Sequence, residues 1–276
     1  MSALRGVPVR EALDSAVVAL SAAGVDTPRL DAEVLLAHAL GVDRARLVID
    51  RDRAVEGPAV RAFQDAVRRR AVAREPVAYI TGVKGFRRLD LRVDGRVLIP
   101  RPETETLVEA ALDLPRGARV VDVGTGSGAV ALALKDERPD LDVVATDTST
   151  DALAVARANA ARLGLDVAFV EGDLLDGAGD VDAVVSNPPY VEDSATLQPE
   201  IARHEPAVAL YAGPEGLTVI RRLVAAVAAS RAGFVALEVG MGQAGEVAVV
   251  LRGAGFAETE TRRDLAGIER VVSGRR

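Results

Sequence analysis

The tetrapeptide Asn187-Pro188-Pro189-Tyr190 combines residue types that could hold a flat nitrogen group. Its prolines restrict their own backbone and that of the preceding residues, so the Asn187 side chain and the Pro188 carbonyl become acceptors with little freedom to lose. Two fixed acceptors can grip an NH2 group, orient its nitrogen and stabilise the positive charge that it gains on attack. Tyr190 could stack on the flat group. An ordinary proline-rich turn is the alternative.

A glycine-rich turn lies earlier in the chain, in the run Asp122-Val-Gly124-Thr125-Gly126-Ser127-Gly128. Glycines at a strand-to-helix turn let the backbone approach a ligand that side chains would block. With Ala129, the spacing also satisfies the dinucleotide fingerprint G-x-G-x-x-A, so the turn indicates a small-molecule site without selecting the ligand. A tight connection with purely structural glycines is the alternative.

Asp147 ends the next apolar run, Asp142–Thr146, at a distance from the glycines that suits ribose recognition. A carboxylate there can accept hydrogen bonds from both ribose hydroxyls. It could instead cap the helix expected after Thr148–Thr150.

Strand and helix patterns alternate from Arg119 onward, which predicts a mostly parallel sheet covered by helices on both faces. The run Val181–Ser186 leads straight into Asn187, so the tetrapeptide follows the fourth strand at the sheet edge where ligands of such folds bind. Two strand candidates at the end of the chain, 257–262 and 268–273, have no helix between them and must pair as an antiparallel hairpin.

The chain before this alternation is expected to form two further parts. Residues 1–75 show apolar residues at three- and four-residue steps, which predicts a small helical bundle. Residues 76–100 contain short runs, Leu89–Val93 and Arg96–Ile99, punctuated by glycines, which predicts a linking β-hairpin. Residues 101–276 are then the domain that carries both motifs.

Composition argues against several classes of protein. The chain has 34 Lys and Arg residues against 41 Asp and Glu, a net charge of −7, which disfavours a nucleic-acid partner held by a basic surface. It has no Cys and two His, so no metal site is expected. Neither a signal peptide nor an apolar run long enough to span a bilayer is visible, so we expect a soluble cytoplasmic protein without membrane contact.

Together the two motifs resemble a class I S-adenosylmethionine-dependent methyltransferase that modifies planar NH2 groups. Four further stretches resemble the PrmC/HemK family of protein-(glutamine-N5) methyltransferases: Arg74–Gly82, Leu98–Glu105, His204–Leu210 and Ile268–Gly274. The resemblance covers essentially the whole chain. It implies a Rossmann-like sheet of seven strands that ends in an antiparallel hairpin, behind an N-terminal helical domain.

The resemblance also implies an activity and its residues. The chain would act as a monomer and transfer a methyl group from S-adenosylmethionine to the glutamine of the GGQ motif in class I peptide chain release factors, which the helical domain would dock. Asn187, Pro188 and Tyr190 would be catalytic and, with Pro189, would bind the glutamine. Pro100–Glu105 would lie near the methyl-transfer site. The cofactor would contact Asp122, Gly124, Thr125, Gly126, Ser127, Gly128, Asp147, Asp173, Leu174 and Asn187.

Two other functions fit parts of the pattern. A DNA or RNA amino-group methyltransferase could grip a flipped adenine with the same tetrapeptide, although the acidic balance and the lack of a basic recognition domain oppose it. A non-catalytic nucleotide-binding adaptor would need the glycine turn but neither Asn187 nor Tyr190.

Overall fold

The computed structural model describes residues 6–276, which form two compact units. The helical unit contains the described residues up to Gly82 together with Gln198–His204. The sheet unit contains Val83–Leu197 and Glu205–Arg276.

The helical unit confirms the predicted helical N-terminal region. Apolar side chains such as Leu13, Leu20, Leu35 and Phe63 recur at helical spacing and meet in one buried core. A two-residue strand pair joins β1 (Val7–Pro8) to β2 (Ala54–Val55). The helices are α1 (Val9–Ala22), α2 (Pro28–Leu40), α3 (Arg44–Ile49), α4 (Pro58–Arg68), a π-helical turn (Arg69–Ala73), α5 (Val77–Thr81) and α9 (Pro199–His204).

Helix α9 belongs to the helical unit through buried charges, although it lies far along the chain. Arg70, on the π-helical turn, donates to Asp31 over 2.7 Å and to Glu200 over 2.8 Å. Arg74 also donates to Glu200, over 2.8 Å. Removing one member of such a group would leave a buried charge without its partner, so these residues hold α9 against the helical unit.

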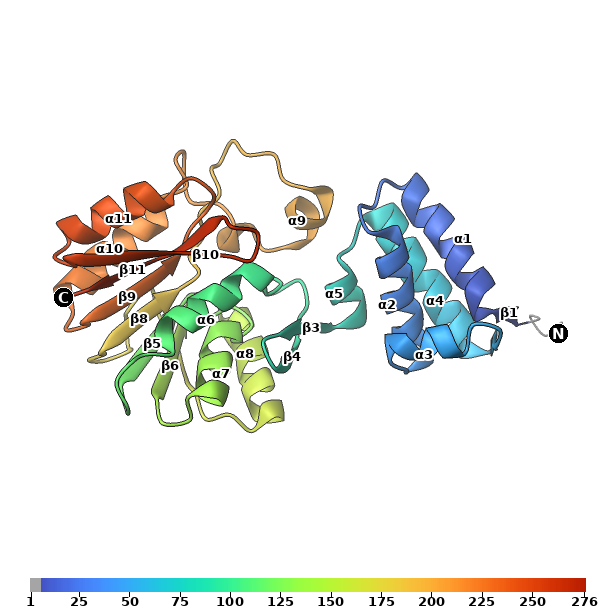
Figure 1. Cartoon of the computed structure of the whole chain (residues 1–276), viewed down its shortest axis with the longest axis horizontal. Helices are drawn as coiled ribbons and strands as arrows, with labels where there is room; N and C mark the ends of the chain where they lie inside the picture. The colour runs from blue at the N-terminus through green and yellow to red at the C-terminus, as the bar shows by residue number, and fades with distance from the viewer. Residues whose placement is uncertain (1–5) are drawn as a thin grey trace. The chain divides into compact units, whose positions relative to one another are not determined.

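The sheet unit has the predicted seven-stranded architecture (Figure 1). Five strands run parallel, and the last two form an antiparallel hairpin beside β9. In spatial order the strands are β10 (Glu258–Arg263), β11 (Glu269–Arg275), β9 (Phe234–Glu238), β8 (Ala183–Ser186), β5 (Arg119–Val123), β6 (Asp142–Asp147) and β7 (Ala168–Glu171).

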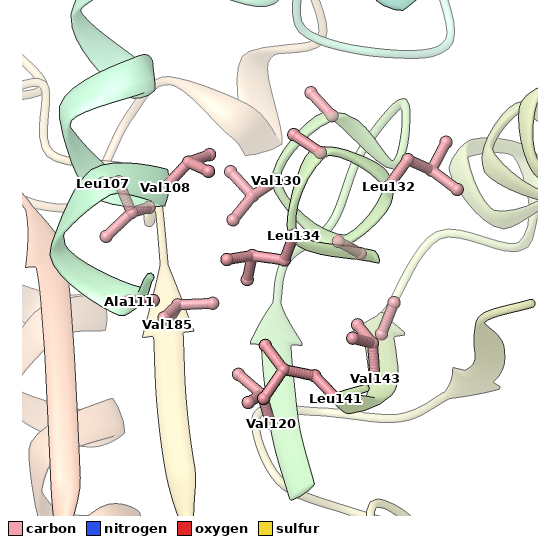
Figure 2. Packing of buried hydrophobic residues seen from close by; sticks show 14 of the residues in the cluster. Leu107, Val108, Ala111, Val120, Val130, Leu132, Leu134, Leu141, Val143 and Val185 are labelled. Atoms are coloured by element: carbon pink, nitrogen blue, oxygen red, sulfur yellow. The ribbon is translucent and has the colours of Figure 1, made fainter. Parts of the chain in front are cut away.

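Helices cover both faces of this sheet because its strands alternate their apolar side chains. Val120 and Val185 face one core, whereas Val121 and Val184 face the other. Figure 2 shows side chains of the first core pointing between its helices and the strands. That core takes α6 (Glu105–Ala111), α7 (Ala129–Glu137) and part of α8 (Thr150–Leu163); the second takes α10 (Thr218–Ala229) and α11 (Ala244–Gly253).

The expected hairpin near residue 90 exists, but one of its predicted strands was wrong. Strand β3 (Val83–Phe86) pairs with β4 (Leu89–Arg92), whereas residues 96–99 form no strand. The Asp94 side chain accepts a hydrogen bond from the Arg96 backbone N–H over 3.1 Å and so favours a turn. The backbone N–H of Ile99 bonds the Glu205 carboxylate over 3.1 Å, and not a neighbouring strand.

Candidate active site

The glycine turn connects β5 to α7 at the carboxyl edge of the sheet. Its start is fixed by the Thr146 carbonyl of β6, which accepts from the backbone N–H groups of Gly124 and Thr125 over 2.9 and 3.0 Å. Gly128 has a φ of 84°, and a Cβ there would lie 3.0 Å from the Leu132 side chain. Both features favour glycine at the start of α7.

Asp122 holds this turn through hydrogen bonds of its side chain. Its carboxylate accepts from the Thr125 hydroxyl over 2.7 Å and from the Ala131 backbone N–H over 3.1 Å. Burial raises the pKa of Asp122 to about 6. Only 1% of the residue is exposed, so the carboxylate acts on the loop and has no open path to a ligand.

Asp122→Asn should change how the free energy of unfolding depends on pH. The folded protein holds the Asp122 proton more tightly than the unfolded chain, so the acid stabilises the fold at low pH and loses that contribution as pH rises through about 6. Between about pH 4 and pH 7, the wild type should lose roughly 2 kcal/mol relative to the variant. Urea unfolding across this range measures the difference, and parallel curves would contradict the assignment.

Asp147 links the glycine turn to the following helix. Its Oδ2 accepts from the Gly126 backbone N–H and its Oδ1 from the Ser149 backbone N–H, each over 2.9 Å. Ser149 caps α8, because its hydroxyl accepts from the Ala152 backbone N–H over 3.1 Å. The capping role considered for Asp147 is therefore filled by Ser149, while Asp147 itself lines a cleft.

The end of β7 supplies a third side of this cleft. Asp173 and Leu174 both line it, and Asp173 accepts from the Arg222 guanidinium over 2.5 Å. Leu174 has a φ of 55°, and its carbonyl accepts from the Thr146 hydroxyl over 2.7 Å. A positive φ is unfavourable for leucine, and the hydrogen bond from Thr146 holds this backbone where it borders the cleft.

The Asn187–Tyr190 turn follows β8 and supplies the fourth side. Asn187, Pro188 and Pro189 line the cleft. The Asn187 side-chain Nδ2 donates to the Thr104 hydroxyl over 3.1 Å, so Oδ1 is the amide atom left for a ligand. Tyr190 points elsewhere: its hydroxyl donates to Glu238 over 3.2 Å, and its ring packs against the second core.

The cleft as a whole has a volume of about 260 Å³. It brings together eight residues that the sequence singled out, from the ends of four neighbouring strands: Gly124, Gly126, Asp147, Asp173, Leu174, Asn187, Pro188 and Pro189. Five others lie beside or beneath it without lining it: Asp122, Thr125, Ser127, Gly128 and Tyr190. An elongated small molecule could therefore run from the acidic end at Asp147 to the Asn187 acceptor.

Three positioning groups were not identified from the sequence. Glu205 holds the segment before α6 by accepting from Ile99 and pairing with Arg101 over 2.5 Å. Thr104 lies in the segment Pro100–Glu105, which was expected near the methyl-transfer site without an assigned role, and it accepts from Asn187. Glu238 is fully buried under Tyr190. The available signal for Glu238 was a lone carboxylate at the end of an apolar run, Gly233–Val239.

Two absences concern the described part of the chain. Within residues 6–276, no helix is both long and apolar enough to cross a lipid bilayer. The same residues contain no group of three or more His, Cys, Asp or Glu side chains that could hold a metal ion.

Known proteins match this chain along nearly its whole length. Residues 11–82 match the PrmC N-terminal domain, and residues 102–226 match the methyltransferase small domain. The chain is 45% identical over 276 residues to the release factor glutamine methyltransferase of Deinococcus radiodurans, covering 97% of this chain and 98% of that protein. The same enzyme of Mycolicibacterium smegmatis is 44% identical over 279 residues, with 97% and 98% covered.

A solved methyltransferase from Pyrococcus furiosus has the same fold. Its TM-score is 0.50 at 18% identity, and the match covers 68% of this chain and 88% of that one. The two enzymes named above match nearly the whole chain at 45% and 44% identity, and the sheet architecture agrees with a methyltransferase fold. The chain therefore belongs to the release factor glutamine methyltransferase family.

Proposed function

We propose that this protein transfers a methyl group from S-adenosylmethionine to the side-chain amide nitrogen of the GGQ glutamine in class I peptide chain release factors. The observation that carries the proposal is the orientation of Asn187, whose Nδ2 is committed to Thr104 beside a cleft that also holds the glycine turn. The similarity to two enzymes named for this activity, at 45% and 44% identity, supports the same substrate.

The cleft fits the cofactor at several points. Gly124 and Gly126 expose backbone where a close approach is needed, and Asp147 keeps unused acceptor capacity for two ribose hydroxyls. Asp173 and Leu174 would border the adenine. When bound, the cofactor supplies a methyl group already activated by a sulfonium.

The chain's own contribution is to hold the nucleophile. An amide nitrogen is a weak nucleophile because its lone pair is delocalised. Asn187 Oδ1 and the Pro188 carbonyl would accept its two hydrogens, orient the nitrogen and stabilise the positive charge that develops there. The extra proton leaves after transfer, so no side chain is needed as a general base.

The helical unit would dock the release factor. It exposes apolar side chains, including Val18, Val48 and Val72, each at least 70% exposed. The protein would act as a monomer in the cytoplasm.

Docking can be tested with Val18→Asp, Val48→Asp and Val72→Asp. At least one should raise the KM for release factor roughly tenfold, because an interface that buries an unpaired charge loses more than about 1 kcal/mol. The dissociation constant of the cofactor should not change. Val249→Asp on α11, where valine is 60% exposed, is the matched control. If no variant of the helical unit changes KM, these apolar side chains do not form the docking surface.

The direct test of the reaction is mass spectrometry of a release factor after incubation with the protein and labelled cofactor. A single labelled methyl group on the GGQ glutamine is expected, and an RNA sample incubated in parallel should stay unlabelled.

A further inference from the structure

Glu238 is a carboxyl group in a place where burial is costly. It is the last residue of β9 and is 0% exposed. Ser186 pairs with Leu237 across the sheet, so Glu238 lies next to the position where Asn187 leaves β8. Burying an ionisable group in an apolar strand destabilises the fold unless its interactions compensate. The groups that contact Glu238 therefore bear on its role.

The partners of Glu238 lead to the site. Its Oε1 accepts from the Tyr190 hydroxyl over 3.2 Å. Its Oε2 is buried and has no hydrogen-bond partner among residues 6–276. The Thr104 hydroxyl lies near enough to the carboxyl to favour its charged form. Thr104 in turn accepts from Asn187 Nδ2 over 3.1 Å and is itself 3% exposed. Glu238, Thr104 and Asn187 therefore form one buried chain of polar groups.

The polar contacts from Asn187 through Thr104 to Glu238 have one direction of donation. A charged carboxylate can only accept, and Oε2 is a buried acceptor without a partner among residues 6–276, so the single hydroxyl proton of Thr104 would point toward it. The Thr104 oxygen must then accept from Asn187, and only Nδ2 can donate to it. The Asn187 amide is thereby held with Oδ1 away from Thr104. A neutral partner in place of the carboxylate could donate to Thr104, which would let Thr104 donate to Oδ1 and let the amide turn over.

We propose that Glu238 is a positioning residue, which acts through Thr104 to decide which end of the Asn187 amide faces the cleft and through the Tyr190 hydroxyl to hold the same turn. This inference rests on the proposed function, in which Oδ1 accepts a hydrogen from the target amide. With the amide turned over, Nδ2 would face the target NH2 group, donor against donor, and transfer would slow.

Contacts other than those of Glu238 also hold the backbone of the Asn187–Tyr190 turn, so a change of the Glu238 side chain should not collapse it. Gln243 donates from Nε2 to the Tyr190 carbonyl over 3.1 Å and accepts from the Gly240 backbone N–H over 2.8 Å. A Cβ at Gly216 would come within 2.3 Å of the same carbonyl, so the backbone of the turn is packed closely from that side as well. These contacts remain when the Glu238 side chain is changed.

Burial brings the titration of Glu238 near neutrality. Burial, and to a smaller degree nearby Glu103, raise the pKa of Glu238 to about 7 against the opposing effects of the Thr104 and Tyr190 hydroxyls and of Arg270. Arg270 itself pairs with Asp264 over 2.9 Å. We expect kcat to increase with pH through about 7 as the carboxylate forms and fixes the direction of the chain.

Glu238→Gln tests the proposal in the full-length protein with release factor and S-adenosylmethionine. The variant should lower kcat roughly 10²-fold, in line with the loss of one oriented group at a reacting centre. The dissociation constant of the cofactor, measured by calorimetry, should stay within about twofold. Glu246→Gln is the matched control, because Glu246 is exposed on α11 and pairs with Arg221 on the surface.

A second pair of variants gives a readout that simple packing would not move. Measured from about pH 5.5 to about pH 8.5, kcat of the wild type should rise with pH, and this rise is called the acid limb. Thr104→Val should remove that limb, because Glu238 can no longer act on Asn187, whereas Thr104→Ser should keep it. If a fall in melting temperature shows that Glu238→Gln is destabilised, the comparison of Thr104→Val with Thr104→Ser tests the role of Glu238 on its own.

The proposed function and the role of Glu238 can fail separately. A wild type that leaves the release factor unmodified would contradict the proposed function. A wild type that methylates it, with Glu238→Gln as active and the acid limb intact in Thr104→Val, would overturn the positioning role and leave the proposed function standing.

Discussion

Asn187→Ala is expected to lower kcat for release factor methylation by roughly 10²- to 10³-fold, the effect seen when an oriented group is removed from a reacting centre. The variant removes Oδ1 as an acceptor and leaves the Pro188 carbonyl as the only grip on the target amide. The cofactor should still bind, because Gly124, Gly126 and Asp147 are unchanged. Steady-state kinetics at saturating cofactor give kcat, and calorimetry gives the affinity.

A control for Asn187→Ala lies just beyond the same turn. Glu192 is exposed two residues beyond Tyr190, so Glu192→Ala removes a polar side chain without touching the cleft and should leave kcat within about twofold. Full activity of Asn187→Ala would show that the amide is held by other groups.

Asp147→Ala should have the second largest effect, on cofactor affinity. Hydrogen bonds from neutral donors to a charged acceptor contribute about 1.5–3 kcal/mol each, so losing the ribose contacts should raise the dissociation constant roughly 10²-fold or more. The Gly126 and Ser149 backbone N–H groups also lose their acceptor, which loosens the turn in the same direction. At saturating cofactor, kcat should change little.

Asp151→Ala separates ligand contact from a general loss of charge near α8. Asp151 is exposed in the first turn of that helix, where its charge stabilises the helix terminus by less than about 1 kcal/mol. Its removal should leave cofactor affinity unchanged. An unchanged affinity in Asp147→Ala itself would restrict Asp147 to holding the glycine turn.

The sheet could be predicted from the sequence because its signals are local. Apolar strands separated by amphipathic helices require crossover connections, and two adjacent strands with no helix between them must form a hairpin. Both features match the order β10-β11-β9-β8-β5-β6-β7. By contrast, Arg96–Ile99 looks like a strand from its apolar residues, yet the Asp94 turn and the distant Glu205 decide its path.

The residues that hold the site were harder to predict because their partners are distant in sequence. Thr104 and Asn187 are 83 positions apart, and Arg70 and Glu200 are 130 apart. No local pattern indicates such pairs. The position of Asp122 was within reach of the sequence, since alternation along β5 puts it on the same face as Val120, under α7 and away from the cleft.

Site-resolved mass spectrometry of a release factor, incubated with labelled S-adenosylmethionine and either the wild type or Asn187→Ala, tests the role of Asn187 most directly. One methyl group is expected on the GGQ glutamine with the wild type and almost none with the variant. An unmodified glutamine beside a labelled nucleic acid, or equal labelling by both proteins, would contradict this expectation.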